Sequence, residues 1–118
     1  MQPVETLVHA LLARLDARDT DGICSLLVDD AAMVDEITKG WLIGREALRQ
    51  HLSNTLASVD SISSTVRDIR VRQKGHFATV TCVLDQTYVI GGNTVSITAP
   101  TSISVEQTNG TWLVVQMH

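Results

Sequence analysis

Apolar residues in the first half of the chain recur every three or four positions, the period at which side chains share one face of a helix. The first apolar face consists of Val4, Leu7, Val8, Leu11, Leu12 and Leu15. A second, short helix can begin after Asp19 or Thr20, since both residue types cap helix N-termini. Its apolar face consists of Ile23, Leu26 and Leu27. A third helix begins at Gly44 and carries Leu48, Leu52 and Leu56.

The period changes to two after residue 60, which is typical of β-strands. A first strand around Ile69 and Val71 ends at a Lys74-Gly75 turn. The next strand, residues 77–90, is apolar at even positions, and the strand over residues 94–106 is apolar at odd positions. Gly91-Gly92 and Asn109-Gly110 are hairpin signals between these strands and a last strand over residues 112–118.

A short strand with Ala31, Met33 and Asp35 on one side is predicted before the third helix, followed by a loop over residues 36–43. Helices followed by hairpin-linked strands predict an α+β domain, with the three helices packed on one face of a strongly curved antiparallel sheet. Long, twisted strands curl around the helices and leave a hollow between the two layers. We expect one domain over residues 1–118.

Charge and composition limit the classes of binding partner that the sequence predicts. The net charge is −4, and the one basic group, Arg67 to Lys74, alternates along a predicted strand, so we expect no nucleic-acid partner. No apolar run is long enough to span a membrane and no signal peptide is evident, so we expect a cytoplasmic protein. Cys24 and Cys82 are expected to be buried free thiols, and the four histidines do not have the spacing of a metal site.

Three motifs in order resemble the nuclear transport factor 2-like superfamily and its SnoaL-like members. They are Asp19-Thr20-Asp21-Gly22 with the later pair Asp29-Asp30, Gly44-Arg45-Glu46-Ala47-Leu48, and Gly110-Thr111-Trp112 with its alternating apolar strand. The resemblance implies a cone-shaped α+β barrel with a small-molecule pocket, no cofactor, and a homodimer formed through the outer face of the sheet.

Residues 19–35 are especially similar to ketosteroid isomerase. That resemblance implies that Asp35 is a general base, and it places Leu11 and Ser102 at the two hydrogen-bond donor positions. Leu11 cannot donate a hydrogen bond, and Ser102 is a weaker donor than a neutral carboxylic acid. The resemblance also turns Ser102 inward, whereas the apolar alternation on its strand turns the odd residues inward, and both registers stay open.

Asp35 is the strongest candidate for chemistry. A carboxylate on the buried side of a strand would have its pKa raised by desolvation, towards the range that acid–base catalysis needs. The alternative is that the strand ends at Val34 and Asp35 lies in water. The expected function is small-molecule binding with acid–base turnover, such as isomerisation, cyclisation as in a polyketide cyclase, dehydration or epoxide opening. A non-catalytic binding or dimerisation module is the alternative.

Other residues are expected to complete the pocket. Trp41 lies over its mouth or packs outside the third helix, and Tyr88 supplies a hydroxyl group or is an ordinary core or rim residue. His118 is a second acid–base candidate beside Asp35. The apolar wall for a ring-containing ligand consists of Leu11, Leu15, Leu52, Val80 and Leu84. No organic cofactor or metal is expected.

The outward positions Thr79, Thr81, Val83 and Val89 are β-branched and uncharged, which favours a packed face over a solvated one. Light scattering at micromolar concentration should therefore give twice the chain mass of 12.8 kDa. A mass equal to that of one chain would contradict the predicted homodimer.

Overall fold

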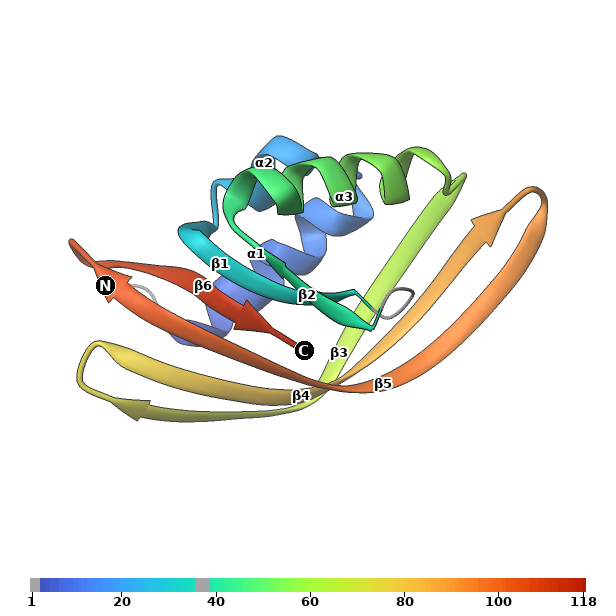
Figure 1. Cartoon of the computed structure of the whole chain (residues 1–118). Helices are drawn as coiled ribbons and strands as arrows, with labels where there is room; N and C mark the ends of the chain where they lie inside the picture. Colours follow the sequence, from blue (N-terminus) through green and yellow to red (C-terminus); the bar gives the residue numbers. More distant parts are fainter. Residues whose placement is uncertain (1–2, 36–38) are drawn as a thin grey trace.

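The computed structural model describes residues 3–35 and 39–118 as three helices and six strands. The helices are α1 (Val4–Asp16), α2 (Thr20–Cys24) and α3 (Arg45–Ala57). The strands are β1 (Leu27–Asp35), β2 (Gly40–Ile43), β3 (Ser61–Lys74), β4 (Phe77–Ile90), β5 (Asn93–Thr108) and β6 (Thr111–Met117). Helices packed on one curved sheet confirm the α+β class (Figure 1).

The six strands form one sheet in the order β2-β1-β6-β5-β4-β3. Every neighbouring pair is antiparallel except β1 and β6, which run parallel. The expectation of a wholly antiparallel sheet is therefore corrected to a mixed one. The sheet curves around the helices without closing, and the β4–β5 turn reaches beyond the helix layer (Figure 1).

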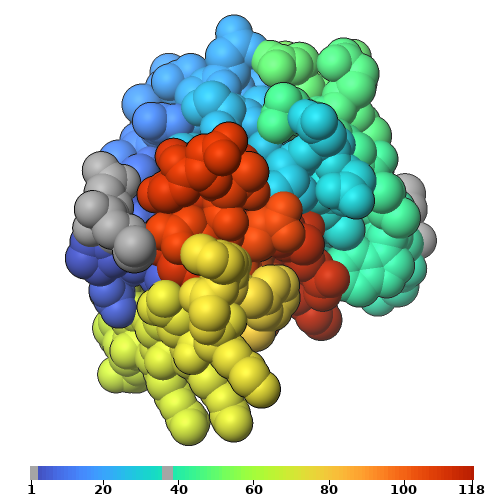
Figure 2. Space-filling view, turned by 90° about the vertical axis from the view of Figure 1, so that its left-hand side faces the viewer, coloured from blue at the N-terminus to red at the C-terminus, as the bar shows by residue number. Residues whose placement is uncertain are grey.

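The helices cover the concave face of the sheet, and the core lies between the two layers. Helix α1 contacts β3 and β6, while α3 contacts β1 and β2. The largest fully buried side chains are Val8, Cys24, Leu27, Leu48, Val80, Val105 and Val114. The β5–β6 turn, the β3–β4 turn and the start of α1 lie on the same side of the molecule (Figure 2). The apolar helix faces and the inner positions of the strands thus pack against one another, as their periods predict.

The structure differs from the sequence expectations around the first two strands. Helix α2 ends at Cys24, so Leu27 begins β1, which is four residues longer at its start than predicted. Residues 40–43 belong to β2 rather than to a loop, because this short segment pairs with β1 and satisfies its backbone groups there. Residues 36–38 of the predicted loop lie outside the described residues.

Local capping explains where the helices begin. The Asp19 side chain accepts a hydrogen bond from the Gly22 backbone N–H at 2.9 Å, which caps α2 as predicted. Gly44 has a φ of +99°, a conformation that favours glycine, and this lets the chain leave β2 and enter α3 abruptly. None of the described helices is long and apolar enough to cross a membrane.

Asp16 connects the end of α1 to the edge strand β3. Its Oδ2 accepts the Ser64 backbone N–H at 3.0 Å, a donor that has no neighbouring strand to pair with on that side. This bond holds the helix against the strand and satisfies a partly buried N–H group.

We predict that Asp16→Ala lowers the free energy of unfolding by about 1–3 kcal/mol, because it leaves the Ser64 N–H without an acceptor. Asp16→Asn retains an oxygen acceptor and should lose less. Urea unfolding followed by circular dichroism measures both, with Asp30→Ala, an exposed position, as the control. Equal losses of unfolding free energy in the two Asp16 variants would contradict a stabilising role of the acceptor oxygen.

Candidate functional site

Alternation along β4 and β5 decides which side chains face the helices. Val80 and Cys82 on β4 are buried, and their partners on β5 are Ile103 and Thr101. The even residues of β4 and the odd residues of β5 therefore form the inner face. Ser102 is exposed on the outer face, as the apolar alternation predicts and contrary to the inward position that the resemblance implies.

Asp35 lies on the inner face of β1, and it is 9% exposed. Its neighbours on the same side of the strand, Ala31 and Met33, are apolar. Within residues 3–35 and 39–118, Asp35 is the one polar or charged residue that is as deeply buried as the apolar core. The water-exposed alternative for this carboxylate is thereby excluded.

The strand register brings Asp35 level with Thr101. Met33 is paired with Met117 of β6, and Met117 with Ile103 of β5, so these three residues form a row across the inner face. The next inner row, two residues further along each strand, contains Asp35 on β1 and Thr101 on β5. Strand β6 lies between β1 and β5 in the sheet, so the backbones of Asp35 and Thr101 are two strand spacings apart, about 10 Å.

A hollow of about 250 Å³ lies beside the end of β6. Its lining consists of Thr81, Cys82, Pro100, Thr101, Ser102 and His118. Residues of the inner face and of the outer face both contribute, so the hollow lies at the edge of β5 beside His118. The hollow beside Thr101 is therefore open to solvent.

The predicted apolar wall is mostly packed core. Val80 is fully buried, Leu52 is buried, and Leu15 packs on the core from its edge. Leu11 and Leu84 do line an enclosed apolar cavity, but its volume is only about 20 Å³. The complete lining is Val8, Leu11, Leu12, Val66, Cys82, Leu84, Thr101, Ile103 and Met117. A space of this size holds about one water molecule, so side chains fill most of the expected pocket.

The inner face continues as an open apolar surface towards the β4–β5 turn. We call the end of β4 and the start of β5 beside this turn the apolar arm. On its inner face, Ile90, Val95 and Ile97 are 41%, 36% and 40% exposed, and Tyr88 beside them is half-buried. This arm lies beyond the helix layer (Figure 1). An apolar ligand would find its contact surface here rather than in a closed cavity.

Trp41 and His118 come together on the outer face. Their ring centroids are 6.3 Å apart in an edge-to-face arrangement. His118 and Ser102 exchange two backbone hydrogen bonds of 2.9 Å, which places them side by side in the sheet. Trp41 is paired with Val34, the neighbour of Asp35, and so lies on the opposite side of the sheet from it. The structure thus groups Trp41, Ser102 and His118, and separates their side chains from Asp35.

Thr101 is a candidate that the sequence reasoning missed. Its hydroxyl group is on the inner face and donates to the Ala99 carbonyl oxygen at 3.1 Å. The signal was present in the odd-numbered apolar set of its strand, in which Thr101 lies between Ala99 and Ile103. The resemblance pointed one residue further along, to Ser102.

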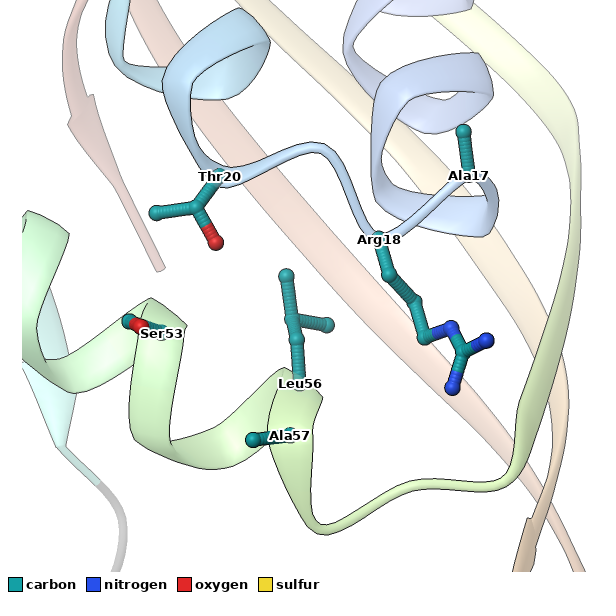
Figure 3. A pocket seen from close by; sticks show the side chains of 6 residues that line it. All are labelled: Ala17, Arg18, Thr20, Ser53, Leu56 and Ala57. Atoms are coloured by element: carbon teal, nitrogen blue, oxygen red, sulfur yellow. The ribbon is translucent and has the colours of Figure 1, made fainter.

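A larger hollow, of about 370 Å³, lies in the helix layer between the end of α1, the start of α2 and the second half of α3 (Figure 3). Its lining is Ala17, Arg18, Thr20, Ser53, Leu56 and Ala57 (Figure 3). The Arg18 guanidinium donates to the Val59 carbonyl oxygen at 2.8 Å and so ties α1 to the end of α3. None of the sequence-predicted site residues lines this hollow, which is therefore separate from the candidate site.

The thiols and carboxylates do not form a metal centre. Cys24 and Cys82 are free and buried, as predicted, and burial raises the pKa of each thiol. Across the described ranges, no group of three His, Cys, Asp or Glu side chains could hold a metal ion.

Asp85 is the centre of a polar network on the outer face of the sheet. It accepts hydrogen bonds from the Thr98 hydroxyl at 2.7 Å and from Arg67 Nε at 2.9 Å. The Thr98 hydroxyl first, and Arg67 second, hold the pKa of Asp85 below its ordinary value. Because the folded pKa is lowered, this stabilisation is present above the unfolded pKa of about 4 and is lost as the pH falls below it.

We predict that NMR titration of Asp85 gives a midpoint below that of an unfolded reference peptide, and that Thr98→Val raises it. Ser96→Ala, on the same face of β5, is the control and should leave the midpoint in place. An unchanged midpoint in Thr98→Val would contradict the assigned cause.

Comparison with known proteins identifies relatives of this fold. The model of the SnoaL-like domain family matches residues 4–118. A proposed dehydratase of the NTF2-like family from Streptomyces avermitilis is 19% identical, with a TM-score of 0.88 over 98% of this chain and 90% of that one. A proposed scytalone dehydratase from Novosphingobium aromaticivorans is 15% identical, with a TM-score of 0.84 over 97% and 78%.

An NTF2-like protein with a cystatin-like fold, also from Novosphingobium aromaticivorans, is 17% identical, with a TM-score of 0.79 over 97% of this chain and 76% of that one. No curated protein matches the sequence. At these identities the solved structures support the fold, and the chemistry has to be argued from this chain's own residues.

Proposed function

This chain belongs to the SnoaL-like domain family, and on that basis we propose that it binds a small apolar, ring-containing molecule against the concave face of its sheet and that Asp35 removes a proton from it. The observation that carries the proposal is the burial of Asp35 among apolar residues on the inner face of β1. A buried carboxylate on an otherwise apolar face is a functional-site candidate.

The chemistry follows from two polar groups that lie level with each other on the inner face, Asp35 and Thr101. The Asp35 carboxylate takes a proton from a carbon next to a carbonyl group of the ligand, and the electron pair of the C–H bond moves to the carbonyl oxygen. The Thr101 hydroxyl, now bonded to the Ala99 carbonyl, turns to donate a hydrogen bond to that oxygen. A neutral hydroxyl stabilises the enolate only modestly, so the substrate needs an acidic C–H bond.

Two reaction outcomes share this first step. If Asp35 returns the proton to a different carbon, the product is an isomer. If a hydroxyl group leaves the adjacent carbon and takes the proton from Asp35, the products are water and a dehydrated molecule. The two relatives described as dehydratases are compatible with the second outcome. We assign no role in this step to Trp41, Ser102 or His118, because their backbone pairing turns these side chains to the outer face.

Hydrogen–deuterium exchange tests the base without knowledge of the natural substrate. β-Tetralone has an acidic C–H bond next to its carbonyl group, and its exchange in deuterium oxide can be followed by proton NMR. Asp35→Asn keeps the shape of the side chain and removes the proton acceptor, so the catalysed exchange rate should fall roughly 10²-fold while binding is nearly unchanged. Asp30→Asn, on the same strand but exposed, is the matched control. A wild-type rate no higher than that of Asp35→Asn would overturn the catalytic proposal.

Thr101→Val tests the donor in the same assay. It keeps the β-branched shape and removes the hydroxyl group, so the exchange rate should fall about 3- to 10-fold, the contribution of one neutral hydrogen bond. Ser102→Ala, the outward neighbour, should exchange at the wild-type rate. The reverse order of effects would place Ser102 rather than Thr101 at the donor position.

A non-catalytic binding module is the second candidate function. The observation in its favour is the enclosed cavity of about 20 Å³, which leaves the open apolar arm as the main contact surface. Under this alternative, wild-type protein binds β-tetralone and does not accelerate its exchange.

A further inference from the structure

One polar residue interrupts the apolar inner face of β4. The even positions of this strand are Ala78, Val80, Cys82, Leu84, Gln86, Tyr88 and Ile90. Gln86 is half-buried among them and is paired with Ile97 on one side and Ser64 on the other. A leucine here would complete the apolar surface, so the amide group calls for a physical reason.

The amide of Gln86 is hydrogen-bonded to the neighbouring strand β3. Its Nε2 donates to Ser64 Oγ at 3.1 Å. Ser64 is itself anchored, because its backbone N–H donates to Asp16 Oδ2 at 3.0 Å. This chain of bonds uses the amide nitrogen and leaves the amide oxygen, Oε1, as an acceptor for a hydroxyl group.

Gln86 lies further along the inner face than Thr101, at the start of the apolar arm. Thr101 is paired with Cys82, and Gln86 is four residues further along β4, a backbone distance of about 14 Å. The inner positions between them, Leu84 and its partner Ala99, are apolar. The inner face therefore offers a polar group, then an apolar stretch, then a second polar group.

We propose that Gln86 is a specificity-determining residue that accepts a hydrogen bond from a hydroxyl group at the far end of the ligand. The ligand class is then an elongated, flat, apolar molecule with a polar group at each end. This inference rests on the proposed binding of a ligand to the concave face, and it adds which molecules that face selects. Discrimination arises because a ligand without the far hydroxyl leaves the Gln86 oxygen covered and unpaired.

Two probes that differ by one hydroxyl group test the inference. They are para-phenylphenol and para,para′-biphenol, and their affinities are measured by isothermal titration calorimetry on the full chain. Wild-type protein should bind the biphenol about fivefold more tightly, the effect of one hydrogen bond. Gln86→Met keeps the length of the side chain without its amide, and it should abolish the preference while para-phenylphenol still binds.

Thr87→Val is the matched control, because Thr87 is the next residue on β4 and bonds to Ser96 on the outer face. It should retain the wild-type preference. Ser64→Ala is a second test that leaves Gln86 in place but frees its amide, and the preference should then shrink. If Gln86→Met does not fold, the probe preference of Ser64→Ala tests the role of Gln86 instead.

The outcomes separate the inference from the function on which it rests. Equal binding of the two probes by wild-type protein, or a preference that survives in Gln86→Met, overturns the role of Gln86 and leaves the proposed ligand site standing. Binding of neither probe overturns both.

Discussion

Alternation of side chains across long paired strands is the constraint on which the rest of this structure depends. Strands β4 and β5 are paired without a shift from Phe77 and Glu106 to Ile90 and Asn93, so one register assigns every side chain on both strands to one face or the other. The inner set packs against the helices near Val80 and Ile103 and becomes an open apolar surface near Val95. Core and ligand surface are thus two parts of the same face.

The register across β6 relates the two polar residues of the candidate site. Strand β6 lies between β1 and β5, and the row from Met33 through Met117 to Ile103 puts Asp35 on β1 level with Thr101 on β5. Both residues lie on the inner face, where Asp35 is buried among apolar neighbours. A buried carboxylate on an apolar face is the condition that general-base chemistry on an apolar ligand requires.

Local patterns in the sequence predicted much of this arrangement, and the failures have physical causes. Helical periods predicted α1 and α3, and the period of two predicted β4 and the inward side of β5. The parallel contact of β1 with β6 joins segments far apart in the chain, and no local signal marks it. For the same reason β2 was taken for a loop, since only its pairing with β1 makes residues 40–43 a strand. On β5, the alternation of apolar residues predicted which side chains face inward, whereas the motif pointed to Ser102, which is exposed.

The central claim is that a ligand binds the concave face and not the outer one. Methyl-resolved NMR with para-phenylphenol tests this directly, because the chain carries methyl groups on both faces. Intermolecular nuclear Overhauser effects should appear to Val95, Ile97 and Leu84, whose side chains lie on the inner face. Contacts confined to Val83, Val89 and Ile43 on the outer face would contradict the account.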